Sequence, residues 1–256
     1  MVSNLLVFIG LGYSLNHLTR EAYEWLERAN VIYVDTYTSL YEDPLELLRD
    51  INPRAEFILA KRRDLEGESI ARIVERARRE VVAIAVPGDP FIATTHDAIL
   101  SEAIKRGVEF KVVHGLSILT MAYSRLGLQS YRFGKIVTLV YPEHFKPFST
   151  LDVIYDNLSR GLHTLVLLDL KVEESRAMSI PEAVDILVEL DYQDMLRERL
   201  SIALARLGWR DEKICAEQLY KLKNHKYPPP PHSLVIVGRS DPVEEEIVEY
   251  WKKKCN

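Results

Sequence analysis

The segment VVAIAVPGDP (residues 81–90) decides the fold of this chain. Its first six residues, Val81–Val86, are all apolar, as expected for a strand that is covered on both faces in a parallel sheet. The two prolines that follow fix φ and remove two backbone donors, while Gly88 permits a positive φ. The sequence therefore predicts a buried parallel strand that ends in a rigid turn and holds Asp89 in one place.

Strands and helices alternate on both sides of this segment. Apolar residues recur at helical spacing in Thr19–Ala29 and again in Glu66–Arg79. The alternation predicts an open α/β sheet with right-handed crossovers. The expected order is strand Leu5–Gly10, helix Thr19–Ala29, strand Val31–Asp35, short helix Pro44–Arg49, strand Glu56–Leu59, helix Glu66–Arg79, strand Val81–Val86, helix His96–Arg106 and strand Glu109–Val113.

The pattern changes after Gly115, where strands follow one another with few helices between them. Consecutive strands favour a mixed sheet. We therefore predict an α/β protein with an N-terminal α/β domain (residues 1–114, an open and mostly parallel sheet) and a C-terminal α/β domain (residues 115–256, a mixed sheet). The expected elements are helices Ile118–Arg125, Thr150–Arg160, Pro181–Leu190 and Pro242–Lys253, and strands Lys135–Val140, His163–Leu170, Leu200–Leu207, Cys215–Leu222 and Ser233–Val237.

The composition is that of an ordinary soluble globular protein. It is 47% hydrophobic and 28% charged, which excludes disorder, collagen and a small disulfide-stapled scaffold. The charge of −5 is spread along the chain, so nucleic acid is not expected as a partner. No apolar run approaches the roughly 20 residues that cross a bilayer, and Met1–Phe8 lacks a signal-peptide pattern, so we expect a cytoplasmic protein without membrane contact.

The two cysteines, Cys215 and Cys255, lie in no CxxC pattern and no Cys/His cluster of the sequence. They are interpreted as reduced thiols of a cytosolic protein. No metal site is therefore expected.

Glycine-bearing turns follow three of the expected strands. In Gly10–Tyr13 (GLGY), a dinucleotide fingerprint would need a third glycine at Leu15, so the NAD interpretation fails there and a tight structural turn is the alternative. In His114–Ile118, Ser117 can cap a helix whose N–H groups bind a carboxylate. Since ligands of open α/β sheets bind outside the carboxyl ends of the strands, we expect the three turns to converge on one small ligand.

Asp89 and two histidines are the polar candidates near these turns. Asp89 can accept hydrogen bonds from a bound amine or hydroxyl pair, or form an Asx-turn within its own loop. His96 follows the expected N-cap Thr95 and is interpreted as a partly exposed polar residue rather than a general base. His232 follows the tract Pro228–Pro231, which is interpreted as a stiff linker in preference to a ligand for another domain.

The motifs of the whole chain, taken together, resemble those of the diphthine synthases, the methyltransferases of diphthamide biosynthesis within the tetrapyrrole-methylase-like fold family. GDP alone marks the wider family, whereas GDPFIATTH combined with GLHTLVLLDLK is far more specific. The motifs are FIGLGY (Phe8–Tyr13), YTSL (Tyr37–Leu40), PGDPFIATTH (Pro87–His96), GLSI (Gly115–Ile118), FGK (Phe133–Lys135), YPE (Tyr141–Glu143), GLHTLVLLDLK (Gly161–Lys171), LARLG (Leu204–Gly208) and PPHSLVIVG (Pro230–Gly238).

The resemblance implies a homodimer that binds S-adenosylmethionine in a cleft between its two domains and releases S-adenosylhomocysteine. The implied acceptor is a histidine of translation elongation factor 2 that bears a 3-amino-3-carboxypropyl arm, whose amine is trimethylated to give diphthine. No metal and no catalytic base are assigned, and His96 and His232 are the base candidates considered. The implied cofactor-binding residues are Tyr13, Asp89, Ile92, Ser117, Ile118, Leu168, Leu207 and His232.

Three alternatives remain at this point. The first is a methyltransferase of the same fold that acts on a tetrapyrrole or another small molecule, because the GDP turn is shared. The second is a nicotinamide-dependent oxidoreductase built on the GLG turn. The third is a non-enzymatic scaffold that presents the proline tract to a partner.

Overall fold

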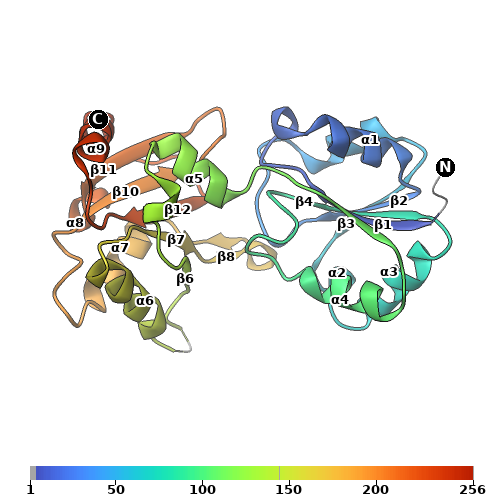
Figure 1. Cartoon of the computed structure of the whole chain (residues 1–256), viewed down its shortest axis with the longest axis horizontal. Coiled ribbons are helices and arrows are strands. Elements are labelled where there is room, and N and C mark those ends of the chain that lie inside the picture. Colours follow the sequence, from blue (N-terminus) through green and yellow to red (C-terminus); the bar gives the residue numbers. More distant parts are fainter. Residues whose placement is uncertain (1–3, 144, 256) are drawn as a thin grey trace. The chain divides into compact units, whose positions relative to one another are not determined.

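The protein has two compact units, each built around a five-stranded sheet (Figure 1). The structure is a computed structural model that describes residues 4–143 and 145–255. The first unit comprises Met1–Ser117 with Val172–Ser175, and the second comprises Ile118–Lys171 with Arg176–Asn256. The division thus falls after Ser117 rather than at 114, and four residues from the second half of the sequence join the first unit. In the described part of the chain, no helix has both the length and the apolar character needed to span a membrane.

The first unit is a parallel sheet in the order β3-β2-β4-β1-β5. β1 and β4 are buried at every position and pair in register from Leu5–Val81 to Gly10–Val86, so their carboxyl ends are level. The strands are β1 (Leu5–Gly10), β2 (Val31–Asp35), β3 (Glu56–Ala60), β4 (Val81–Val86) and β5 (Phe110–Val113).

Helices cover both faces of this parallel sheet (Figure 1). Alternate residues of β1 point to opposite faces, and two separate cores result. Val7 and Ile9 share a core with Leu26 of α1, whereas Leu6 and Phe8 pack in a core with residues of α3 and α4. The helical elements are η1 (Leu15–His17), α1 (Arg20–Arg28), η2 (Leu45–Ile51), α2 (Arg62–Leu65), α3 (Ser69–Ala77) and α4 (Asp97–Lys105).

The second unit is a mixed sheet in the order β11-β10-β12-β7-β6, in which only the β6–β7 pair is parallel. The expected mixed sheet is thus confirmed. Its strands are β6 (Val137–Leu139), β7 (Thr164–Leu168), β10 (Leu200–Ala205), β11 (Lys213–Gln218) and β12 (His232–Ile236), and a separate short hairpin is formed by β8 (Leu170–Lys171) and β9 (Arg176–Ala177).

The helices of the second unit also cover both faces of its sheet. Leu151 of α6 and Val184 of α7 lie in one core, and Leu126 of α5 and Trp251 of α9 lie in the other. The helical elements are α5 (Ile118–Leu126), η3 (Ser130–Arg132), α6 (Phe148–Ser159), η4 (Val172–Glu174), α7 (Ile180–Glu189), α8 (Leu219–Leu222) and α9 (Pro242–Lys252). α7 and α9 begin where the sequence supplies a capping box with a proline in the first turn, with Ser179 and Asp241 as the N-caps.

Two expected elements are wrong in extent. The helix expected over Glu66–Arg79 is α3, which begins only at Ser69 and ends at Ala77, because Gly67 adopts a φ of 62° and separates it from the short helix α2 that precedes it. The strand expected over Cys215–Leu222 ends at Gln218, and the remaining four residues form α8. In that segment Leu219 and Leu222 are fully buried. Apolar residues three positions apart lie on the same face of one helical turn, so the spacing fits a helix, but a short apolar segment does not by itself distinguish a helix from a strand.

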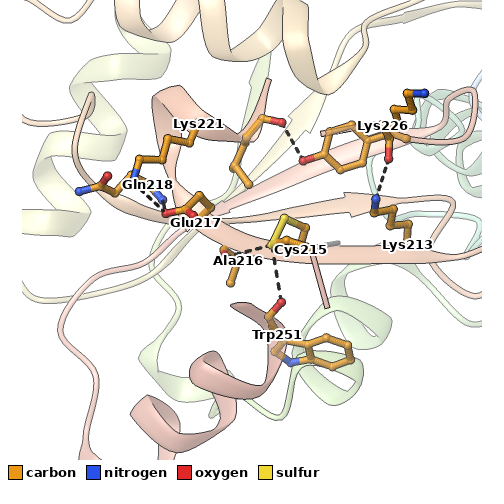
Figure 2. The surroundings of a disulfide bond; sticks show 11 residues. Lys213, Cys215, Ala216, Glu217, Gln218, Lys221, Lys226 and Trp251 are labelled. Carbon is orange, nitrogen blue, oxygen red and sulfur yellow. Dashed lines mark hydrogen bonds and ion pairs between the residues drawn. A yellow bond between two sulfur atoms is a disulfide. The ribbon is translucent and has the colours of Figure 1, made fainter. Parts of the chain in front are cut away.

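The two cysteines are not reduced thiols, so that expectation was wrong. Cys215 of β11 and Cys255, beyond the end of α9, form a disulfide with an S–S distance of 2.11 Å (Figure 2). Because 40 residues separate the two cysteines, no local motif in the sequence indicated that they pair. The bond fastens the chain after the last helix to the sheet of the second unit.

Candidate functional site

The three glycine-bearing turns of the first unit meet at the carboxyl edge of its sheet. A β-carbon on Gly115 would lie 2.2 Å from the carbonyl oxygen of Gly88 and 2.7 Å from the carbonyl carbon of Gly10. Gly12 and Gly88 also exchange two backbone hydrogen bonds, with N–O distances of 3.1 and 2.6 Å. The three turns meet as expected, because β4, β1 and β5 are neighbours and their ends are level, whereas a small ligand at this edge stays a prediction.

Asp89 holds two of these turns together. Its carboxylate accepts hydrogen bonds from the amide of Phe91 (3.2 Å), the amide of Gly115 (3.3 Å) and Nδ1 of His114 (3.0 Å). The bond to Phe91 is the Asx-turn considered from the sequence. Asp89 is only 7% exposed, so its first role is to fix the loop after β4 against the loop after β5.

Tyr13, Ile92 and Ser117 lie in the same three turns. The hydroxyl oxygen of Tyr13 is 2.9 Å from the position of a β-carbon on Gly88, so the ring crosses the turn that follows β4. Ile92 is half-buried, and its neighbour Ala93 has a φ of 57°. A non-glycine residue in the left-handed region costs about 1–3 kcal/mol, and such strain clusters at ligand sites. Ser117 is buried two residues after Gly115.

A buried pair, Asp35 and His96, braces this edge and was missed as a pair in the sequence. His96 was expected to be partly exposed, but it is fully buried, and its Nε2 lies 2.8 Å from Oδ2 of Asp35. Because an ionised carboxylate only accepts hydrogen bonds, Nε2 is the donor. The Asp35 carboxylate also accepts hydrogen bonds from the amides of Tyr37 (2.8 Å) and Thr38 (3.0 Å) and from the Thr38 hydroxyl.

These bonds set the charge of Asp35. Burial by itself raises the pKa of this carboxyl, but the hydrogen bond and charge of His96 and the donors of Thr38 and Tyr37 outweigh it, so the pKa lies below its usual value. The signal in the sequence was an aspartate at the end of a buried strand, directly before the YTSL motif. Its partner could not be recognised, because 61 residues separate the two.

In the second unit, Leu168, Leu207 and His232 lie at the same end of three neighbouring strands, β7, β10 and β12. His232 pairs with Ala205 at the end of β10, and the next residue of β12, Ser233, pairs with Leu167 in β7. All three side chains are buried, with at most 9% exposed. Arg206, directly before Leu207, has a φ of 50°, and its amide donates to the carbonyl of Pro231 (2.9 Å). A strained non-glycine residue thus adjoins a predicted cofactor residue in this unit as well.

Both ring nitrogens of His232 are used within the fold. Nδ1 accepts a hydrogen bond from the amide of Ile180 (3.1 Å), and Nε2 donates to the carbonyl oxygen of Pro228 (2.8 Å). Burial lowers the pKa of His232 to about 4, against an opposing effect of the Pro228 carbonyl. No lone pair remains to take a proton from a substrate, so the ring has a structural role in orienting the chain before β12.

We expect acidification to destabilise the second unit through His232. The ordinary pKa is 6.5 and the folded value about 4, so the unfolded chain takes up a proton that the folded chain refuses. The free energy of unfolding should therefore fall as the pH drops below 6.5, by about 3 kcal/mol once the pH reaches about 4. Nearby, Arg206 lowers this pKa and Glu182 raises it.

Urea unfolding measured across this pH range checks the prediction. In His232→Gln, an amide replaces the acceptor and the donor without titrating, so the pH dependence should become shallower. His163, which is also buried with a lowered pKa, supplies part of the remaining slope. His225→Gln, at a half-buried histidine of the same unit, is the control, and a slope as steep in the His232 variant as in the unaltered protein would contradict the assignment.

The structure gives the nicotinamide interpretation of the GLG turn no support. The residue that should be the third glycine, Leu15, begins the 3-10 turn η1, and α1 starts only at Arg20. A dinucleotide fingerprint instead leads directly into a helix whose N-terminus meets the pyrophosphate. The turn after β1 is therefore not built for a dinucleotide.

Comparison with known proteins shows the family of this chain. Residues 5–223 match the family described as Tetrapyrrole (Corrin/Porphyrin) Methylases. The chain is 55% identical over 248 residues to the diphthine synthase of Staphylothermus marinus, which covers 96% of this chain and 93% of that protein. It is 34% identical over 273 residues to the diphthine methyl ester synthase of Bos taurus, which covers 96% and 95%.

A crystal structure described as diphthine synthase superposes with a TM-score of 0.87 at 32% identity and covers 97% of this chain and 96% of that one. The likeness spans both units, so it confirms the predicted α/β fold and the resemblance of the motifs. The chain belongs to the tetrapyrrole methylase family, among the diphthine synthases, and is an S-adenosylmethionine-dependent methyltransferase.

Proposed function

We propose that this enzyme methylates the 3-amino-3-carboxypropyl-histidine of translation elongation factor 2 on its amine, giving trimethylated diphthine. The observation that supports this most is the 55% identity, over nearly the whole of both chains, to a protein described as diphthine synthase. We also propose that it acts as a cytoplasmic homodimer. The second candidate is methylation of a tetrapyrrole, supported by the description of the family.

The residues of the first unit fit a ligand held largely by main-chain groups. Gly10, Gly88 and Gly115 leave no room for a β-carbon, so the edge presents bare backbone, and Asp89 adds a carboxylate that suits a cation. We propose that Tyr13, Asp89, Ile92 and Ser117 contact S-adenosylmethionine at this edge. Ile118, Leu168, Leu207 and His232 of the second unit remain the other proposed contacts.

The proposed reaction needs no side chain as a nucleophile or a general base. The bound cofactor supplies a methyl group already activated on a sulfonium. Methyl transfer is an in-line displacement, so the rate comes from alignment and from the exclusion of water, both of which a rigid backbone edge provides. His232 has no free lone pair and His96 is fully buried against Asp35, which supports solvent as the acceptor of the amine proton.

The test is methyl transfer to elongation factor 2 that carries the aminocarboxypropyl arm. With labelled S-adenosylmethionine, label should appear in the elongation factor, and its mass should rise by three methyl groups after exhaustive reaction. Label in a corrin or porphyrin acceptor and none in the elongation factor would establish the second candidate instead. A mass increase of one or two methyl groups would refute the trimethylated product.

Asp89→Ala checks the proposed cofactor edge. It leaves the amides of Phe91 and Gly115 without their acceptor, and an unsatisfied buried donor costs about 1–3 kcal/mol. We expect the Kd for S-adenosylmethionine, measured by calorimetry, to rise at least about tenfold. Asp97→Ala removes an exposed carboxylate at the start of α4 and is the control. Equal Kd values for the two variants would exclude Asp89 from the site.

A further inference from the structure

Cys215, His225 and Cys255 meet in the second unit, although they come from three separate segments. Cys215 lies in β11, His225 follows the short helix α8, and Cys255 lies beyond α9. Each offers one donor atom, and the two sulfur atoms and the ring nitrogen all lie within 4.8 Å of one another. Two thiolates and an imidazole form a donor set that suits a thiophilic divalent ion such as Zn²⁺.

The disulfide and a metal ion exclude each other at this place. While the two sulfurs share a bond, neither is a thiolate, and only thiolates bind metal strongly. We propose that reduction of the Cys215–Cys255 disulfide turns this cluster into a Cys₂His site for Zn²⁺, with water in the fourth position. The proposal is independent of the methyl acceptor.

The conversion balances in two steps. A dithiol reductant gives two electrons and two protons to the disulfide and leaves as its own disulfide, so that Cys215 and Cys255 become thiols. The metal ion then displaces both thiol protons, which pass to solvent, and binds two thiolates and the neutral ring of His225.

The surroundings of the three ligands are suited to holding a metal ion. Cys215 is fully buried and Cys255 is 6% exposed, and both lie in one apolar core with Leu219 and Leu222. An apolar shell limits the access of further water to the ion. His225 is half-buried, so an ion can reach the two sulfur atoms from the side on which this ring lies.

The segment that carries His225 is held in place from two sides. Nζ of Lys213 donates to the carbonyl of Lys226 at 2.8 Å, and the Tyr227 hydroxyl donates to the carbonyl of Leu222 at 2.9 Å. Figure 2 shows Lys213 and Lys226 joined in this way beside Cys215. The backbone on either side of His225 is thus held in place before any ion binds, which reduces the entropy lost on binding.

The reduced chain without metal has a competing arrangement. Sγ of Cys255 lies 3.3 Å from the carbonyl oxygen of Ala216 and 3.8 Å from that of Trp251 (Figure 2). After reduction these carbonyls can accept a hydrogen bond from the Cys255 thiol, which is lost when the ion takes the place of the thiol proton. The metal then holds the end of the chain to β11, as the disulfide does under oxidising conditions.

Cobalt binding to the full-length protein tests the proposal. The protein is reduced with a dithiol, freed of it without air, and titrated with Co²⁺, whose thiolate complexes absorb strongly in the near ultraviolet. We expect a thiolate-to-cobalt band that saturates at one ion per chain, is removed by Zn²⁺, and is absent from the oxidised protein. His225→Asn removes one ligand, so it should weaken Co²⁺ binding at least about 10- to 100-fold, the loss typical even of an outer-shell partner.

The controls separate a built site from chance binding by two thiols. His225 is half-buried in a turn, so His225→Asn should fold, and circular dichroism checks this. His114→Asn, at an exposed histidine of the first unit, should leave the cobalt affinity unchanged. The proposal is overturned if the reduced protein shows no thiolate band, if the band forms with the disulfide intact, or if His225→Asn binds Co²⁺ as the unaltered chain does.

Discussion

Gly115→Ala should lower the rate of methyl transfer by about 100-fold. The new β-carbon would overlap the carbonyl oxygen of Gly88, 2.2 Å away, and the backbone of Gly10, so the loop after β5 must move away from the loops after β1 and β4. Displacing a binding edge by about 1 Å can cost about 100-fold in rate. Overpacking costs about 3 kcal/mol of stability at the upper end of its usual range. Turnover, S-adenosylmethionine binding and urea unfolding measure the three effects.

Gly238→Ala is the matched control for this prediction. Its β-carbon would lie 2.4 Å from the carbonyl oxygen of Leu162, a similar backbone clash within the second unit. It should cost similar stability while the folded protein keeps more of its affinity for the cofactor. Equal loss of affinity in the two variants would show that the close packing of Gly10, Gly88 and Gly115 has no specific role in binding S-adenosylmethionine.

Asp35→Ala should lower the free energy of unfolding of the first unit more than any other single substitution described above. It leaves Nε2 of His96 and the amides of Tyr37 and Thr38 without their acceptor in a fully buried place. Breaking a buried hydrogen-bonded pair by removing one partner costs about 3–5 kcal/mol. The loss, measured by urea unfolding, should be full at neutral pH and shrink as the pH falls through the lowered pKa of Asp35.

Two further variants show whether Asp35 stabilises the first unit through its hydrogen bonds or through its charge. Asp35→Asn keeps an acceptor for the two amides and can donate to the other tautomer of His96, so it should cost clearly less than Asp35→Ala. Asp50→Ala removes an exposed aspartate of η2 and should change stability by less than about 0.5 kcal/mol. If Asp35→Ala costs no more than Asp50→Ala, the pair does not brace the site.

Apolar patterning fixed the strands that build the site. Val81–Val86 and Leu5–Gly10 lie where they were predicted, because a strand buried on both faces leaves an uninterrupted apolar run. Turn chemistry fixed the loops after them, since glycine and proline allow few conformations. Local pattern was ambiguous in residues 219–222, where it did not distinguish a strand from one turn of helix.

Long-range pairs were decided only by the tertiary structure. Asp35 meets His96 across 61 residues, and Cys215 meets Cys255 across 40, so neither pair leaves a local spacing that a sequence motif could carry. The same holds for His225, whose place beside the two sulfurs depends on how β11 and the end of α9 pack. The sequence by itself determined the class of fold, the three turns and the family, because these depend on local backbone chemistry and on ordered motifs. Which side chains share a buried site was decided by packing, which brings distant segments together through burial that no single segment encodes.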